Sequence, residues 1–432
     1  MPGRLNIFQR TTLQWNELHP YNAVHCVEVP MSLDLEQLRK MIRSTLESHG
    51  LTGLAVDRKA RTYQYRGGPA REEITRVAAG HNMAIALVNE IRRQLNTAFA
   101  LEERIMPFRF FVAPANSGFF LGVSYLHVVA GAESIVLLMQ DVVNAYLGRD
   151  QRGFVPPVEI YPVSYGPWLR RHPGVVLRKL LNLPSQFRKL GRSWRPIYRD
   201  EMDMGNGFDL FSLTPDQLQL LIDTGKSWGV TLNDLFLTLL LKILAPLQGH
   251  RAFSTRRHLF SVGSIVNIRK DMQVDSRRTF GIFLGSFAVT HAVPEGIRLR
   301  TLATEVHRQT QRIKQTARYM GAPVDLAIAL TLLSFLSTER KKKFYQKHYP
   351  LWGGVTNMNL NTIWPQDNRQ QPINYFRAVS TGPATPLVLS ITTVRDIVNI
   401  GISFRSTVFS PADIEYVKNE FLKLLLQLRN PP

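Results

Sequence analysis

The sequence predicts a mixed α/β fold, of the α/β or α+β class, built as two lobes. The chain has 432 residues, of which 44% are hydrophobic, and a single core rarely grows beyond about 250 to 300 residues. Helical and strand-like patterns alternate in both halves of the chain, which is typical of this class. A basic stretch separates the halves. We therefore expect a first lobe at residues 1–165, a basic linker at 166–205 and a second lobe at 206–432.

The first half opens with a strand followed by an amphipathic helix. Residues 23–29 are mostly apolar and favour a strand. In residues 32–50, leucine and isoleucine recur at helical spacing between Ser32 and Asp34 at one end and Gly50 at the other. These end residues are the ones that N-caps and C′ positions prefer.

A hairpin and a second helix follow. Residues 108–113 and 119–129 are rich in Phe, Val and Tyr and are joined by a short polar turn, which predicts two paired strands. The small residues 130–132 then form a bend. Apolar side chains at helical spacing continue to Tyr146, so the order is strand, tight bend and helix.

The middle of the chain changes character. Residues 170–199 carry nine Lys or Arg, no acidic residue, and prolines at 173, 184 and 196, which is why we expect a linker there. In the second half, helices are predicted to begin at capping residues Thr214, Thr231 and Ser410.

Composition excludes several classes of protein. Cys26 is the single cysteine, so the chain has no internal disulfide and no thiolate zinc site. The first fifteen residues lack the apolar core of a signal peptide. The longest apolar helical stretches, 232–247 and 322–336, contain charged residues and are shorter than the roughly 20 residues of a membrane span. We therefore expect a cytoplasmic protein with buried core helices.

The net charge of +20 favours an anionic partner. Acidic carrier proteins, the phosphates of coenzyme A and an anionic membrane surface all fit, and nucleic acid fits least because no nucleic-acid module is recognisable. Trp168, Phe187 and Trp194 are interleaved with the basic residues of the linker. The alternative is that these charges form solvated faces. The positions predicted to bind an anion or a partner are Arg188, Lys189, Arg192, Lys341 and Lys342.

Among the 11 histidines, His127 has a distinctive position. It ends an apolar strand, on the same face as Tyr125, immediately before the small-residue bend. An imidazole has a pKa near neutrality and can accept a proton from an attacking hydroxyl or amine, which is the work of a general base. The alternative is a structural hydrogen bond to the following loop. No HExxH pattern is present, so no metal is predicted.

Residues 124–134, SYLHVVAGAES, resemble the HHxxxDGxS signature of peptide-synthetase condensation domains and of the related wax-ester synthases and polyketide-associated acyltransferases. The resemblance is degenerate, because one histidine is matched and the aspartate is not. In this register Leu126 stands at the first histidine, His127 at the second and catalytic one, Gly131 at the aspartate, Ala132 at the glycine and Ser134 at the serine.

Other blocks along the chain resemble the same family in the same order. They are residues 12–29, 96–111, 213–247, 261–287, 351–361 and 402–409. The resemblance implies two chloramphenicol-acetyltransferase-like lobes arranged as a V-shaped pseudo-dimer, with a tunnel between them and the histidine at their junction.

The resemblance also implies an activity. An acyl group would move from a coenzyme A or carrier-protein thioester to an alcohol or amine, with His127 as general base and with no bound cofactor. Tyr125, Gly131 and Asn357 are then candidates to line the tunnel, Asn357 through its match to a short "SN" strand of the family. Ordinary packing is the alternative for each of these three.

The absent aspartate affects the motif loop. In the family this residue holds the loop through an arginine, so Gly131 leaves an arginine such as Arg269 without that partner. Glu133 and Ser134 are the candidates to hold the loop instead. The rival interpretation is a condensation-fold protein that lost the reaction and serves as a binding or scaffold protein.

Overall fold

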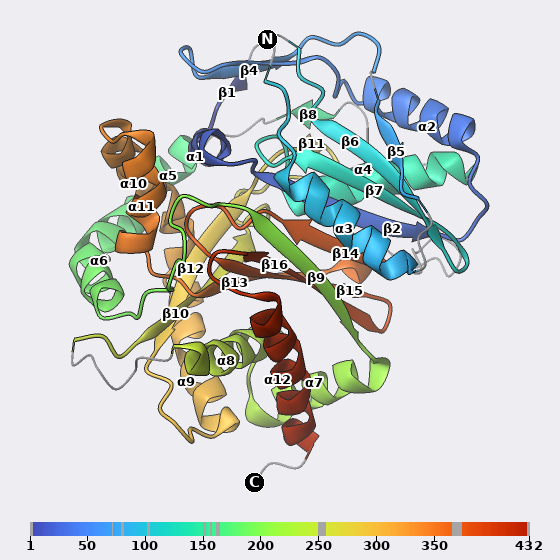
Figure 1. Cartoon of the computed structure of the whole chain (residues 1–432). Coiled ribbons are helices and arrows are strands. Elements are labelled where there is room, and N and C mark those ends of the chain that lie inside the picture. Colours follow the sequence, from blue (N-terminus) through green and yellow to red (C-terminus); the bar gives the residue numbers. More distant parts are fainter. Residues whose placement is uncertain are drawn as a thin grey trace.

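The computed structural model describes residues 3–429 except 71, 79–81, 102–103, 150–152, 156–157, 161–164, 249–255 and 365–373. Two large sheets dominate the described part, one above the other in Figure 1. Each has its own apolar core. The first sheet is formed mainly by the first half of the chain, and the second sheet by the second half.

The first sheet has five strands in the order β14-β2-β7-β6-β5. Its strands are β2 (Asn22–Val29), β5 (Ile74–Arg76), β6 (Phe108–Ala115), β7 (Gly118–Leu126) and β14 (Tyr375–Val379). Strands β6 and β7 form the predicted antiparallel hairpin. Both faces are covered, because Val27 of β2 joins the core that contains helices α2 (Leu35–Ser48) and α4 (Ala132–Tyr146), whereas Cys26 packs with α3 (Met83–Asn96).

The second sheet has six strands in the order β12-β10-β13-β15-β16-β9. Its strands are β9 (Asn206–Leu213), β10 (Phe260–Asn267), β12 (Leu284–His291), β13 (Gly353–Asn359), β15 (Leu387–Val394) and β16 (Ile397–Arg405). Its core is shared with helices α7 (Pro215–Trp228), α8 (Leu232–Leu244), α9 (Leu299–Gln315) and α12 (Pro411–Arg429).

The predicted helix caps are present. The side chain of Asp34 accepts a hydrogen bond from the amide of Gln37, and Thr214 and Thr231 each form a capping box at the start of α7 and α8. Helix α7 ends at Gly229, whose φ of 66° is the left-handed conformation that glycine adopts most readily.

Strand β14 connects the two halves. It belongs to the second half of the chain but pairs antiparallel with β2 at the edge of the first sheet, with Arg377 opposite His25. The short strands β8 (Glu159–Ile160) and β11 (Thr279–Phe280) also pair across the halves. The junction between the lobes is therefore a hydrogen-bonded one.

The segment expected as a linker contains two helices, α5 (Tyr165–Arg171) and α6 (Pro173–Gly191). With α10 (Ala322–Ser334) and α11 (Thr338–His348) they form the left side of the molecule in Figure 1. Lys179 of α6 makes an ion pair of 2.5 Å with Asp325 of α10. Pro184 lies inside α6.

The remaining described elements are β1 (Gly3–Arg4), α1 (Ile7–Leu18), β3 (Leu54–Asp57), β4 (Thr62–Tyr65) and the 3₁₀ turns η1 (Ala245–Leu247), η3 (Arg318–Gly321) and η4 (Leu360–Thr362). Within the described ranges, no single helix has the length and apolarity to cross a membrane; α7 and α8 meet that test only together, as a pair bent by 101°.

Candidate functional site

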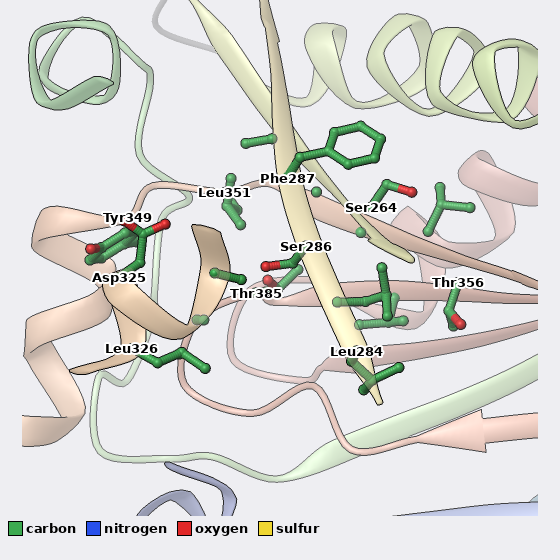
Figure 2. A pocket seen from close by; sticks show the side chains of 18 of the residues that line it. Ser264, Leu284, Ser286, Phe287, Asp325, Leu326, Tyr349, Leu351, Thr356 and Thr385 are labelled. Carbon is green, nitrogen blue, oxygen red and sulfur yellow. The ribbon is translucent and has the colours of Figure 1, made fainter. Parts of the chain in front are cut away.

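A cavity of about 480 Å³ lies where the two sheets meet. Its walls come from strands of both sheets and from α6, α10 and the turn η3 between α9 and α10. Figure 2 shows one part of this wall, with Leu284, Ser286 and Phe287 of β12 on one side and Asp325 and Tyr349 on the helical side. His127 lines the same cavity.

The imidazole of His127 has a defined hydrogen-bonding state. Its Nδ1 lies 3.0 Å from the carbonyl oxygen of Ala130, and a carbonyl oxygen only accepts, so Nδ1 carries the proton and donates. In the neutral ring the lone pair is therefore on Nε2. The ring stacks on Tyr21 with 5.4 Å between centroids. Burial lowers the pKa of His127 below its ordinary value, which keeps the ring neutral near pH 7.

A second histidine lies beside the first. His25 of β2 is buried, and its Nδ1 is 2.6 Å from the hydroxyl of Tyr375. Its Nε2 is 3.5 Å from the hydroxyl of Tyr125, whose ring also packs edge-on against His127. Burial first, then the positive charge of Arg377, and then repulsion from His127 in its protonated form, hold the pKa of His25 well below its ordinary value. The cavity thus has two neutral imidazoles on one wall.

The loop after β7 is anchored to the second half of the chain. The amide of Gly131 donates to the carbonyl of Gly281 at 3.0 Å. Arg269 is 3% exposed and donates from Nη2 to Ser134 Oγ at 2.5 Å and from Nη1 to the carbonyl of Thr279 at 3.0 Å. Ser134 and Arg269 therefore join the two halves at the first turn of α4, the helix that follows the loop after His127.

Glu133 adds a charge to this anchor. Its carboxylate lies 3.8 Å from Nε of Arg269 and accepts a hydrogen bond from the side chain of Asn267. The structure therefore places Glu133 and Ser134 both in contact with Arg269. Gly131 is the N-cap of α4 without a side-chain hydrogen bond.

The candidate tunnel residues are placed differently from one another. Tyr125 is 1% exposed and lines the cavity. Gly131 is not part of the cavity wall, whereas its neighbour Ala132 is. Asn357 is exposed and lies outside the wall of this cavity, whereas its neighbour Thr356 is part of the wall.

Cations gather on the cavity wall. Lys189, predicted as an anion-binding residue, lines the cavity, whereas Arg188 and Arg192 are exposed at the end of α6 and outside the wall. Lys341 and Lys342 lie on α11 and are half-buried. The cationic residues of the wall are Arg178, Lys179, Lys189, Arg312, Arg318 and Arg377. Asp325 is the acidic residue of the described wall.

His25 and Arg377 are two site residues that were not predicted from the sequence. A signal was present, because each is a polar residue inside an apolar strand, in NAVHCVEV and YFRAV. Both are buried and both line the cavity. Among the described residues, no three His, Cys, Asp or Glu side chains are close enough to hold a metal ion.

Neither the protein-family models nor the curated proteins include a match to this sequence. Solved structures do match. The first condensation domain of the CDA synthetase aligns with a TM-score of 0.72 and 15% identity, over 100% of this chain and 97% of that chain. The condensation domain of the Monacolin K polyketide synthase MokA gives 0.68 and 13%, over 100% and 98%.

A third similar structure is described as an epimerization domain. It comes from the third module of tyrocidine synthetase B and gives a TM-score of 0.65 at 15% identity, over 99% of this chain and 96% of that chain. Together these structures show that the chain has the condensation-domain fold, with mixed α/β architecture, as the sequence predicted.

Proposed function

We propose that the protein transfers an acyl group from a thioester to an alcohol or amine, with His127 as general base. The observation that carries this proposal is the hydrogen bond from His127 Nδ1 to Ala130, which leaves the lone pair on Nε2 of a ring that lines the cavity. A general base needs an available lone pair and access to the substrate.

The acyl transfer needs two proton transfers, and His127 can perform both. The acceptor's oxygen or nitrogen attacks the thioester carbonyl carbon while Nε2 of His127 takes the acceptor's proton. The tetrahedral intermediate then collapses, the carbon–sulfur bond breaks, and the thiolate leaves with the proton of the imidazolium. The stacking of His127 on Tyr21 holds the ring in place between the two proton transfers.

The donor is proposed to be acyl-coenzyme A or an acyl group on a carrier protein's phosphopantetheine arm. Either brings phosphate to the cavity, and Arg178, Lys189 and Arg312 on its wall would attract that charge. The condensation domains of similar structure belong to a synthetase and to a polyketide synthase, which supports a carrier-protein partner.

The rival function is a binding or scaffold protein with a blocked site. A cavity of about 480 Å³ that reaches His127 favours the enzyme. The test is a mass-spectrometric screen of acyl-coenzyme A and acyl-carrier-protein donors against pooled alcohols and amines. We expect an ester or amide product from at least one combination. Absence of product from every combination would favour the scaffold.

A further inference from the structure

The cavity holds an arginine whose charge has no carboxylate partner in the described part of the chain. Arg377 of β14 is 4% exposed and lines the cavity. Its Nε donates to the Thr392 hydroxyl at 2.8 Å, and its Nη2 donates to the carbonyls of Ile391 and Thr356 at 2.6 and 3.0 Å.

One face of this guanidinium is available to a ligand. Nη1 has no hydrogen-bonding partner among the residues that the structure describes. Asp325, the acidic residue of the described wall, is paired with Lys179 at 2.5 Å. Burial lowers the pKa of Arg377 to about 10, so the group is desolvated and still charged at neutral pH.

A buried charge without a counter-ion is costly, and a ligand that supplies the counter-ion recovers part of that cost. We propose that Arg377 binds a carboxylate of the substrate inside the cavity. One guanidinium balances one negative charge, and the groups beside it, His25 and the hydroxyls of Tyr125 and Tyr375, are neutral donors or acceptors. A phosphate, with close to two charges at neutral pH, fits this position less well.

The inference rests on the proposed function only in treating the cavity as the substrate site. The carboxylate has two possible sources, a hydroxy-acid acceptor or a dicarboxylic acyl donor. Calorimetric binding distinguishes them without turnover. One arm compares 3-hydroxydecanoate with its methyl ester, and the other compares glutaryl-coenzyme A with pentanoyl-coenzyme A.

We expect the wild-type protein to prefer the carboxylate in one arm by about tenfold or more, the usual strength of a charge-assisted hydrogen bond. Arg377→Gln should remove that preference, and Arg377→Lys should retain part of it. Arg405→Gln is the matched control, because Arg405 is also buried but lies outside the cavity wall.

Two results would overturn the proposal. One is equal binding of acid and neutral partner by the wild-type protein in both arms, a measurement that does not depend on any variant folding. The other is a preference that persists in Arg377→Gln. Because binding is measured directly, a failed product screen leaves this test intact.

A separate observation concerns the outer face of α6. The side of this helix that lines the cavity is polar and includes Lys179, Asn182 and Gln186. The opposite side is apolar and exposed: Leu177 is 59% exposed, Leu180 46%, Leu181 71% and Phe187 46%. The spacing of these four residues puts them on one stripe. A surface helix usually buries its apolar side and exposes its polar side. In α6 the apolar side is the exposed one.

Basic residues lie along the same segment as the apolar stripe. Residues 170–199 carry nine Lys or Arg and no acidic residue, and Arg188 and Arg192 are exposed. Leucine and phenylalanine beside lysine and arginine on one helix are typical of elements that lie in an anionic bilayer surface.

We propose that the outer face of α6 docks on an anionic lipid surface, with the apolar stripe in the headgroup boundary. The test is co-sedimentation with phosphatidylcholine vesicles that contain 30% or 0% phosphatidylglycerol, about the range in which surface charge controls such binding. We expect binding to the anionic vesicles, weakened by salt because exposed charges are screened over about 8 Å at physiological ionic strength.

Two variants separate the apolar and charged contributions. Leu177→Ser with Leu181→Ser should weaken vesicle binding by at least about tenfold, from the lost burial of two leucines. Arg188→Glu with Arg192→Glu should abolish it; Lys189 is left intact because it lines the cavity. Leu426→Ser is the control, since Leu426 is 62% exposed on α12, outside this surface.

The proposal is overturned if the wild-type protein does not sediment with anionic vesicles, or if the leucine pair binds like wild type. Binding of an acyl carrier protein through Leu177 and Leu181, without vesicle binding, would assign this face to a protein partner instead.

Discussion

Nδ1 of His127 donates a hydrogen bond to the carbonyl oxygen of Ala130, only three residues later in the chain. The turn that follows β7 therefore selects the tautomer of the proposed base. Rotation of the ring would cost this hydrogen bond and the stacking on Tyr21.

The first prediction is that His127→Ala lowers the turnover of the acyl transfer by about 100-fold to 10,000-fold, the usual contribution of a positioned base. The fold should persist, because His127 follows the last residue of β7 and is only half-buried. Kinetics together with a circular-dichroism melt check both expectations. His258→Ala, an exposed histidine outside the cavity wall, should keep full turnover. If the well-folded His127 variant retains more than about a tenth of the rate, the base is another group.

The second prediction concerns the pH dependence of the rate. Burial lowers the pKa of His127, so the reactive neutral form persists below the ordinary histidine value of about 6.5. We expect kcat/KM to be constant from about pH 7 to 8 and to fall only when the pH passes below that ordinary value. If kcat/KM instead falls with a midpoint above pH 6.5, the pKa of the base is not lowered, and the prediction is wrong.

The third prediction concerns stability. His25 and His127 have lowered pKa values in the folded state, whereas in the unfolded chain each binds a proton near pH 6.5. Below that pH the unfolded state therefore holds more protons, and the free energy of unfolding should decrease as the pH falls from 7 to 5. Urea denaturation of wild type and His25→Phe measures this; the variant should show a shallower decrease.

The fourth prediction concerns the hydrogen bonds between Ser134 and Arg269. Removing Arg269 takes away a buried donor to the carbonyl of Thr279 and one of two donors to the Ser134 hydroxyl, which still accepts from the amide of Gly281 at 3.1 Å. Arg269→Ala should lower the free energy of unfolding by about 3 kcal/mol, and Ser134→Ala by about 1 kcal/mol. Because the two side chains share one hydrogen bond, the double variant should cost less than the sum of the single variants. Denaturant melts measure the three losses. If the loss in the double variant equals the sum of the two single losses, Arg269 and Ser134 are not in direct contact.

The fifth prediction restores the aspartate of the family motif. A Cβ on Gly131 would lie 3.6 Å from the carbonyl oxygen of Gly281, an ordinary contact, and φ is −85°. Gly131→Asp should raise the free energy of unfolding by a few tenths to about 1 kcal/mol, because aspartate is a better N-cap than glycine. Thermal melts measure the change. Gly122→Ala is the contrasting case, since its Cβ would meet the Phe111 ring at 2.1 Å, and it should be strongly destabilised.

Local patterns were sufficient to predict much of the fold. The cap at Asp34 and the β6–β7 hairpin depend on neighbours in sequence, and both are present. His127 was identified because its strand end and bend are also local. His25 and Arg377 meet only through pairing of β2 with β14, a contact between distant segments that periodicity cannot reveal.

Two other features depend on contacts between distant segments. Asn357 lies outside the wall of the cavity, whereas Thr356 beside it lines the wall, and the packing of the sheets that decides this is not visible in a local pattern. The segment 166–205 was interpreted as a linker from its charge and its prolines. It contains the helix α6, which the Lys179–Asp325 ion pair joins to α10.

The pairing of β14 with β2 also has a consequence for folding on the ribosome. Strand β2 emerges early, yet its edge partner lies about 350 residues later, between Tyr375 and Val379. Synthesis at about 5 to 20 residues per second leaves that edge without β14 for tens of seconds. Exposed strand edges recruit other strands. A nascent chain that stops before residue 375 should therefore aggregate or engage chaperones, because the first sheet is completed only when β14 has been made.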